Sequence, residues 1–476
     1  MRRLAALLLA LAAAGASAIE LAPCRLPGVP QEIRCGQLEV PEDRQAANGR
    51  RLRIAFAVVP ALAKNKAPDP VFVLAGGPGQ AAQGIAALVM PVLAQVNARR
   101  DLVFVDQRGT GRSNALTCPE PAHAQRLAEA FDTRRQIDEL VACLRRLEAD
   151  PRHYGTWIAT HDLEAVREAL GAQRINLWGA SYGTRVALDY LRQFPQRVRS
   201  ATLDGVAPPD MALPASFGVD ADAALDALAA ACARDARCGA RHPALSRQID
   251  AVLARFGSAP MTVRITHPLT GELEAVSLTR EAVAAALRAP LYVPTLAALL
   301  PHAIERAARE DFAPLAAMLA SATGNEATKL AWGMHFAVVC AEDMPRVDAA
   351  ARSRVAATRF GTGFLDLYAY ACARVPHTPA PPAFYELPAT EAPVLILSGG
   401  ADPVTPPHHG TRVAHRLRNA RHLVAPNLGH GVSHHGCAPE LIARFIRQAG
   451  FGGIDGGCLE RLPAPPFFLP PTQAAR

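Results

Sequence analysis

The sequence predicts an α/β fold, in which a mostly parallel sheet carries helices on both faces and a large, mainly helical segment is inserted between two strands. Short apolar runs of strand length alternate with helical segments early in the chain and again near its end. This alternation disappears between about residues 208 and 388, where helical patterns dominate. Half of the 476 residues are hydrophobic, so the chain can bury a large core.

The predicted strands are apolar runs that lead directly into polar or glycine-rich turns, as in "PVFVLAGGPGQ" and "DLVFVDQRGTGRSN". A helical run, "HDLEAVREALG", precedes the strand-like "RINLWGASYG", and this alternation is typical of parallel sheets. The strands are expected within residues 51–60, 70–80, 101–114, 174–183, 200–206, 392–406 and 420–431.

The inserted segment contains helical patterns such as "VDADAALDALAAACARDARC". One predicted hairpin interrupts them, with "MTVRIT" and "LEAVSL" as strands around the turn "HPLTGE". We therefore expect a core in two parts, residues 19–207 and 391–476, separated by a helical insertion over residues 208–390. The second part ends in a proline-rich tail.

The first eighteen residues, "MRRLAALLLALAAAGASA", combine two arginines, a short apolar stretch and small residues at a cleavage position. This combination predicts a secretory signal peptide over residues 1–18, cleaved near Ala18, and hence a periplasmic or secreted protein. The alternative is a buried N-terminal helix. No later run of about twenty apolar residues occurs, so no stable membrane span is expected.

All ten cysteines follow residue 18, and an even number in an exported protein favours disulfides. No CxxC pair is present, which argues against a zinc ribbon or a redox motif. Connectivity does not follow from sequence alone. Pairing of neighbours is the simplest arrangement, and it predicts bridges 24–35, 118–143, 232–238, 340–372 and 437–458.

The chain carries 50 Lys and Arg against 43 Asp and Glu, a formal net charge of +7. These charges are scattered rather than gathered into basic blocks with interleaved aromatic residues, so no nucleic-acid partner is expected. Nothing in the sequence bears on the oligomeric state.

The stretch "GASYG" places Ser181 between two glycines, after a strand-like run and before the helical "TRVALDY". Glycines on either side leave room for a tight corner, on which a serine can adopt a strained backbone conformation. The alternative is an ordinary structural turn. A strand, a turn of this kind and a helix are the context of a nucleophilic serine.

A nucleophilic serine needs a general base and an acid that orients the base. Asp402 follows the strand-like "PVLILSG", and His430 follows "HLVAP". Taken singly, Asp402 could be a turn-forming Asp-Pro and His430 an ordinary loop histidine. Both lie just after the carboxyl ends of predicted strands, where open α/β sheets bind ligands, and this coincidence favours a catalytic triad of Ser181, Asp402 and His430.

The oxyanion of an acyl-transfer intermediate needs preorganised donors. The backbone N–H of Tyr182, directly after the serine, is one candidate. The second is expected from "AGGPGQ", where Gly77 is the better donor and Gly76 the next, because Pro78 has no N–H. The alternative for this loop is a Gly-Pro turn.

Two histidine pairs, His408-His409 and His434-His435, could suggest a metal. No HExxH motif or ligand set with zinc spacing accompanies them, so neither a catalytic metal nor another cofactor is expected. We expect these histidines to be solvated or to support catalytic residues.

"GGPGQ", "DQRGTGRS", "GASYG", "LDGV", "GGADPVTP" and "GHG" together resemble secreted α/β-hydrolases of the prolyl iminopeptidase and tripeptidyl aminopeptidase type. The resemblance extends from about residue 35 to 458. It implies an α/β-hydrolase fold, a helical cap over the active site and removal of residues from peptide N-termini. It also implies that Ser181, Asp402 and His430 are the triad and that Gly77 and Tyr182 form the oxyanion hole.

One departure from the family pattern is Ala75, since the glycine loop of the family is often preceded by His. The backbone donors remain, so catalysis is expected to survive, whereas the support of the loop is in question. "DQRG", residues 106–109, is expected to be a buried structural network beside the site.

An exopeptidase must hold the ammonium group of a free N-terminus, which requires an acidic partner. "VVCAEDMP" in the insertion offers Glu342 and Asp343, next to Cys340. The alternative is a solvated turn before Pro345.

These observations predict a serine exopeptidase that acts on peptide substrates. A carboxylesterase or lipase on the same scaffold is the first alternative, because one triad can cleave both esters and amides. A catalytically inactive hydrolase fold used for binding is the second, although the complete set of Ser, Asp and His argues against it.

Overall fold

The computed structural model describes residues 19–46, 48–118, 132–257, 259–267, 270–323 and 329–470. The predicted signal peptide, residues 1–18, lies outside these residues. No helix in these ranges is long and apolar enough to cross a membrane.

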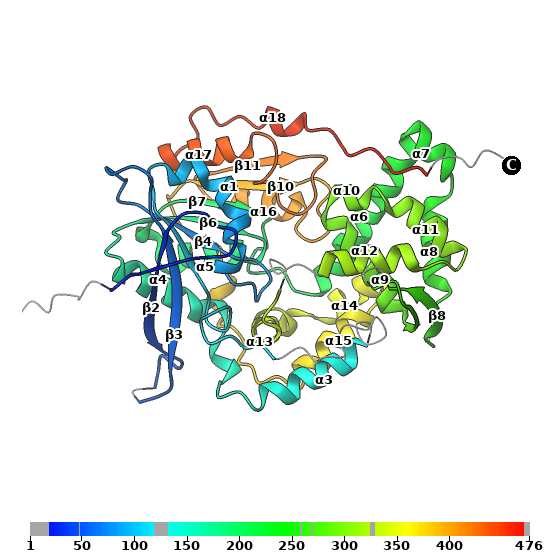
Figure 1. Ribbon diagram of the computed structural model, residues 1–476, viewed down its shortest axis with the longest axis horizontal. Coiled ribbons are helices and arrows are strands. Elements are labelled where there is room, and N and C mark those ends of the chain that lie inside the picture. The colour runs from blue at the N-terminus through cyan, green and yellow to red at the C-terminus, as the bar shows by residue number, and fades with distance from the viewer. Residues whose placement is uncertain are drawn as a thin grey trace, which may run out of the picture.

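A nine-stranded sheet forms the centre of the described structure, in the order β1-β2-β3-β5-β4-β6-β7-β10-β11 (Figure 1). Pairing is antiparallel from β1 to β5 and parallel from β5 to β11. The strands are β1 (Ala22–Cys24), β2 (Ile33–Pro41), β3 (Arg51–Val59), β4 (Val71–Leu74), β5 (Leu102–Val105), β6 (Ile175–Ala180), β7 (Val198–Asp204), β10 (Val394–Gly399) and β11 (Ala420–Ala425).

Seven of these strands fall where the sequence predicts them. The other two, β1 and β2, escaped prediction because they lie at the antiparallel edge. There, β2 does not alternate regularly between buried and exposed residues, and it contains Gly36 and Pro41, which both disfavour strands.

The central strands are buried on both faces, and alternate side chains enter separate cores. Val71 and Val73 of β4 pack with α1 (Ala86–Asn97) and α17 (Ala438–Gln448). Phe72 and Leu74 face the opposite side, towards α4 (Thr156–Ala169) and α5 (Tyr182–Gln193). The predicted helices on both faces are therefore present. The part of the chain outside the insertion also contains α3 (Thr133–Leu144), α16 (Pro407–Arg416), α18 (Gly457–Glu460) and the 3-10 turns η1 (Gln83–Ile85), η2 (Pro151–His153) and η3 (Pro195–Arg197).

The chain between β7 and β10 is mainly helical, and it divides between two hydrophobic cores. Its first part packs around a core of its own and lies at the opposite end of the molecule from β2 and β3 (Figure 1). The elements of this part are α6 (Ala215–Arg234), α7 (Ala236–Arg241), α8 (Leu245–Ala254), β8 (Met261–Thr266), β9 (Leu273–Leu278), α9 (Arg280–Arg288), η4 (Ala289–Tyr292), α10 (Pro294–Ala297), α11 (Leu300–Ala308) and α12 (Ala313–Thr323). Strands β8 and β9 are the hairpin that the sequence predicts.

The second part of the insertion joins the sheet. Side chains of α13 (Trp332–Glu342) and α15 (Gly363–Cys372) belong to the same hydrophobic cluster as α5. Between and after them lie η6 (Met344–Arg346), α14 (Ala349–Ala356) and η7 (Pro382–Tyr385).

The five predicted disulfides are confirmed: Cys24–Cys35, Cys118–Cys143, Cys232–Cys238, Cys340–Cys372 and Cys437–Cys458. Their Cα atoms lie 5.1–6.4 Å apart, within the normal range for a bridge. No cysteine in the described ranges is free. Such complete pairing suggests an oxidising compartment.

Candidate active site

Ser181 occupies a strained corner between β6 and α5, with φ 56° and ψ −127°. A non-glycine residue adopts such a conformation only where its surroundings impose it. A side chain at Gly183 would collide with the carbonyl oxygen of Leu74, and one at Gly179 would lie 2.5 Å from the carbonyl oxygen of Gly183. The two glycines are therefore required for the close approach of strand and helix, and together they hold the serine on the corner.

Asp402 and His430 meet across the ends of β10 and β11. His430 Nδ1 donates to Asp402 Oδ2 at 2.8 Å. Asp402 Oδ1 accepts the backbone N–H groups of Val404 and Thr405, and the Thr405 hydroxyl donates to Oδ2. Because Nδ1 carries the donated proton, Nε2 is the basic nitrogen of the neutral ring.

The charges of this pair support each other. Burial raises the pKa of Asp402, but the attraction and hydrogen bond of His430, together with the hydrogen bonds of Thr405, outweigh burial, so the pKa lies below its usual range. Burial lowers the pKa of His430, but Asp402, with help from Asp204, raises it above the ordinary value of 6.5. Asp402 is therefore ionised at neutral pH, where it orients the imidazole and stabilises its protonated form.

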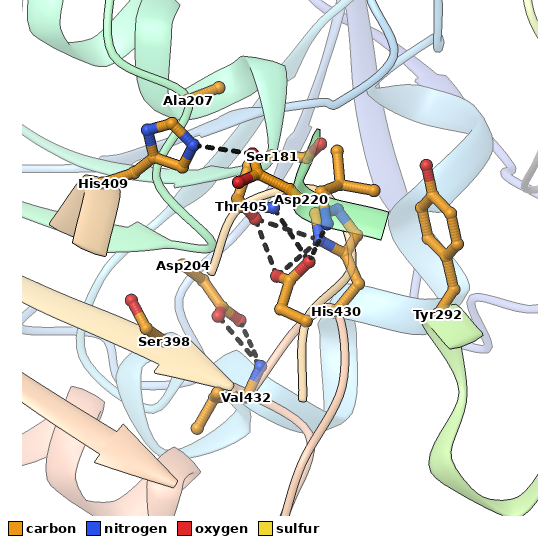
Figure 2. Close-up of polar contacts among 12 residues, drawn as sticks. Ser181, Asp204, Ala207, Asp220, Tyr292, Ser398, Thr405, His409, His430 and Val432 are labelled. Atoms are coloured by element: carbon orange, nitrogen blue, oxygen red, sulfur yellow. Dashed lines mark hydrogen bonds and ion pairs between the residues drawn. The ribbon is translucent and has the colours of Figure 1, made fainter. Parts of the chain in front are cut away.

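Ser181 and His430 lie close together, and both are near Thr405 (Figure 2). No hydrogen bond is drawn between the hydroxyl of Ser181 and the imidazole of His430 in Figure 2. Catalytic hydrogen bonds commonly tighten only when substrate binds.

Asp204, at the end of β7, connects Ser181 to the loop of His430. Its backbone carbonyl accepts the N–H of Ser181 at 2.9 Å. Its buried carboxylate accepts the N–H of Val432 at 2.9 and 3.0 Å (Figure 2) and that of Ser433 at 2.8 Å. The motif "LDGV" contains Asp204 but does not reveal its role, and the position of Asp204 between the two loops indicates that it positions both.

The predicted oxyanion loop lies against the nucleophile. An added Cβ at Gly76 would be 3.2 Å from Ser181 Cβ, so the loop backbone is adjacent to the serine. The φ of Gly77 is +107°, a value that side-chain-bearing residues rarely adopt. Tyr182 is the first residue of α5, so its N–H has no partner within the helix.

A histidine supports this loop, but it comes from the insertion rather than from position 75. His335 of α13 contacts the carbonyl oxygen of Pro78 through Nδ1 at 3.0 Å and the hydroxyl of Tyr368 through Nε2 at 2.8 Å. Burial lowers the pKa of His335 to about 4, so the ring is neutral at neutral pH. A carbonyl can only accept, so Nδ1 donates to Pro78 and Nε2 accepts from Tyr368.

The predicted network at residues 106–109 is confirmed as buried structure. Arg108 is fully buried, and it donates to Asp162 at 2.6 and 2.8 Å. Asp106 accepts the backbone N–H groups of Gln83 and Arg112. Gln107 donates to the hydroxyl of Tyr182, so the network also braces the residue after the nucleophile.

Glu342 and Asp343 are fully buried, which differs from the solvated turn and from an open amine site. Arg185 of α5 donates to Asp343 at 3.0 and 3.1 Å and to Glu342 at 3.2 Å. Glu342 also accepts the N–H of Thr156 at 2.6 Å. Burial raises the pKa of Glu342 to about 7; Arg185 opposes this shift and Asp343 adds to it. These partners give both carboxylates a structural role, and their role as an amine anchor stays a prediction.

Tyr292 brings the insertion into direct contact with His430. Its carbonyl oxygen accepts the N–H of His430 at 3.0 Å, and its ring packs edge-on against the imidazole at 5.3 Å. Its hydroxyl accepts a hydrogen bond from Arg288. Arg288 and Glu281 line a small pocket of about 30 Å³, whose apolar walls include Phe217 and Phe364. No motif in the sequence pointed to Tyr292 or Arg288.

The histidine pairs differ in their environments. His434, His435 and His408 are exposed, as expected. His409 is buried, and its Nε2 lies 3.0 Å from Asp220 Oδ2 (Figure 2).

Comparison with protein-family models matches residues 69–435 to the family described as alpha/beta hydrolase fold. The chain belongs to the α/β-hydrolase fold family. The expected fold is thereby confirmed, and the arrangement of Ser181, Asp402 and His430 at the ends of three strands agrees with it.

Three relatives illustrate the family resemblance. YuaR of Escherichia coli (strain K12), named as a hydrolase, is 30% identical over 270 residues, covering 52% of this chain and 52% of the relative. Serine protease Hip1 of Mycobacterium tuberculosis is 31% identical over 214 residues, 40% of each chain. Tripeptidyl aminopeptidase of Streptomyces lividans is 28% identical over 196 residues, 38% of this chain and 36% of the relative. The matches thus span between 36% and 52% of the relatives' own length. The names agree with the predicted resemblance to serine peptidases of this fold.

The raised pKa of His430 predicts the pH dependence of hydrolysis. The base must be neutral to accept a proton, so kcat/KM should rise with pH through an apparent pKa above 6.5. Initial rates of hydrolysis of a short acyl ester between about pH 5 and 8 measure this rise, which is the acid limb of the pH profile. A rate that does not change over this range would contradict His430 as the base.

Asp204→Asn should reduce kcat/KM by up to about 100-fold, because it weakens the contacts that position the His430 loop. Removal of the negative charge should also move the acid limb of the pH profile to lower pH, since Asp204 contributes to the raised pKa of His430. Asp210→Asn, in an exposed pair with Arg412, is the matched control. An unshifted acid limb in a folded Asp204→Asn protein would show that this carboxylate does not act on the base.

Proposed function

We propose that the protein is a serine exopeptidase that hydrolyses peptide bonds near the free N-terminus of peptides through an acyl-enzyme on Ser181. The observation that carries the proposal is the strained Ser181 corner beside an ionised Asp402 that is bonded to His430. This arrangement provides a nucleophile, a base and an orienting acid.

In the proposed mechanism, His430 Nε2 takes the proton of the Ser181 hydroxyl as Oγ attacks the scissile carbonyl. The N–H groups of Gly77 and Tyr182 donate to the resulting oxyanion. His430 then returns the proton to the leaving amine, and the C–N bond breaks to leave an ester on Ser181. Water attacks this ester with His430 again as base, which releases the acid product and restores the hydroxyl.

Two observations favour a peptidase over an esterase. Two of the three relatives described above are named as a serine protease and a tripeptidyl aminopeptidase. In addition, Arg288, which donates to the hydroxyl of Tyr292, lines one small pocket together with the carboxylate of Glu281, and a peptide offers groups of both signs. A carboxylesterase or lipase uses the same triad and remains the principal alternative. An inactive binding protein is the other.

The proposed location is the periplasm or the exterior of the cell. The sequence of residues 1–18 has the pattern of an export signal, and five disulfides require an oxidising compartment to form.

A fluorophosphonate probe should label the protein at Ser181 alone. Ser181→Ala and His430→Ala should each lower kcat by roughly 10⁶-fold, and Asp402→Asn by roughly 10⁴-fold.

Hydrolysis of aminoacyl and tripeptidyl arylamides, compared with hydrolysis of a short acyl ester, distinguishes an exopeptidase from an esterase. Efficient ester cleavage without arylamide cleavage would favour the esterase, and inactivity of the folded protein on both would favour the binding protein.

Glu342→Gln should lower the cleavage of free-amine peptides and of the ester by the same factor, because the buried carboxylate contacts Arg185 and Thr156 rather than substrate. Glu281→Gln, which changes a carboxylate that lines the pocket, is the matched comparison. The activities of each variant on both substrates, measured together with its thermal midpoint, decide whether Glu342 is structural or binds the substrate amine. Selective loss of peptide cleavage in Glu342→Gln would support its predicted role, and Asp343→Asn extends the test.

A further inference from the structure

Three potential metal ligands from distant parts of the sequence meet where the insertion joins the core. Asp220 lies on α6, and His408 and His409 begin α16. His409 Nε2 is 3.0 Å from Asp220 Oδ2, and His408 Nε2 is 3.6 Å from Asp220 Oδ1. One ligand atom from each residue can be chosen so that all three lie within 4.8 Å of one another.

An ordinary ion pair accounts for only part of this arrangement. A single buried histidine, His409, would satisfy Asp220, yet the exposed His408 also turns its Nε2 to the same carboxylate. Adjacent residues on a helix point about 100° apart, because one turn takes 3.6 residues. Here the two imidazoles lie close together, with ring centroids 4.0 Å apart.

We propose that Asp220, His408 and His409 bind a divalent transition metal of the Zn²⁺ type. Neighbouring ligand atoms of a tetrahedral Zn²⁺ with bonds of about 2.0–2.2 Å lie about 3.3–3.6 Å apart, so ligand atoms that already lie within 4.8 Å of one another need only small side-chain shifts to surround one ion. Two imidazoles and one carboxylate suit Zn²⁺ better than Ca²⁺ or Mg²⁺, which prefer oxygen ligands. The exposed side of His408 provides the entry path, and water completes the coordination.

The metal would join the insertion to the loop of the catalytic acid. Helix α16 begins shortly after Thr405, which donates its hydroxyl hydrogen bond to Asp402. Helix α6 contacts η4, whose last residue, Tyr292, binds the loop of His430. A bound ion would therefore stabilise the attachment of the insertion to the core. This role is structural, and it depends on neither the substrate nor the proposed peptidase activity.

The affinity should be moderate rather than that of a structural zinc centre. Metal-bound histidines usually donate their second nitrogen to a partner that fixes the ring, whereas His409 Nδ1 is buried without a hydrogen-bond partner among the described residues. We expect one saturable site and an increase in thermal midpoint on binding, because the ion binds the folded form.

The test is isothermal titration of ZnCl₂ into the chelator-treated protein, purified without a polyhistidine tag. His408→Ala removes the exposed ligand and leaves the pair of Asp220 and His409 intact. It should weaken Zn²⁺ binding by more than about tenfold, because loss of a residue that only hydrogen-bonds to a metal ligand already weakens binding by about that factor. His409→Ala and Asp220→Asn should abolish the saturable phase and the thermal shift. The double variant His434→Ala/His435→Ala, which removes the exposed pair, should bind as the unaltered protein does.

The result that would overturn the proposal is an unaltered protein without a saturable Zn²⁺ site. Equal binding by His408→Ala, or loss of binding in the His434→Ala/His435→Ala control, would also overturn it. Because His408→Ala leaves the Asp220–His409 pair in place, its result does not depend on whether the other two variants fold.

Discussion

The geometry of the site depends on the hydrogen bonds of Asp204, a buried residue at the end of β7. Through its backbone, Asp204 holds the N–H of Ser181, and through its side chain it holds the N–H groups of Val432 and Ser433. A carboxylate can accept several hydrogen bonds, so the side chain holds two N–H groups of the His430 loop, while the backbone carbonyl of the same residue holds Ser181. Its negative charge also favours the protonated form of His430, which forms during each proton transfer.

The insertion takes part in the site rather than merely covering it. Tyr292 binds the backbone of His430, and His335 binds the carbonyl of Pro78 in the glycine loop. The base and the oxyanion loop are thus each held by one residue of the insertion. Because His335 is neutral at neutral pH, the support that it gives to the loop does not change across the range in which His430 titrates.

Buried charge also joins the insertion to the core, through Arg185 with Glu342 and Asp343. Removing three charges from water is costly, and their mutual attraction offsets that cost only where hydrogen bonds satisfy the remaining groups. Thr156, Leu213 and Met211 supply such bonds. One guanidinium neutralises only one of the two carboxylates, which agrees with the raised pKa of Glu342. The network therefore defines one relative position of α5 and α13.

The sequence by itself determined the features that depend on local pattern. Apolar runs followed by turns predicted seven strands of the sheet, and the glycines around Ser181 predicted the strained corner. Short separations between cysteines predicted the five disulfides. The positions of Asp402 and His430 after two strands were enough to predict their contact, because parallel strands end at one edge.

Only the tertiary structure decided which polar residues are partners across long separations. From the sequence alone, "AED" resembles an acidic turn. Its partner Arg185 lies 157 residues before Glu342, so the neighbouring sequence gives no sign that both carboxylates are buried against it. The roles of Asp204, His335 and Tyr292, and the meeting of Asp220 with His408 and His409, follow from the packing of the insertion against the sheet. Local sequence sets backbone conformation over a few residues, whereas the burial and charge of a side chain depend on residues that only the complete fold brings near.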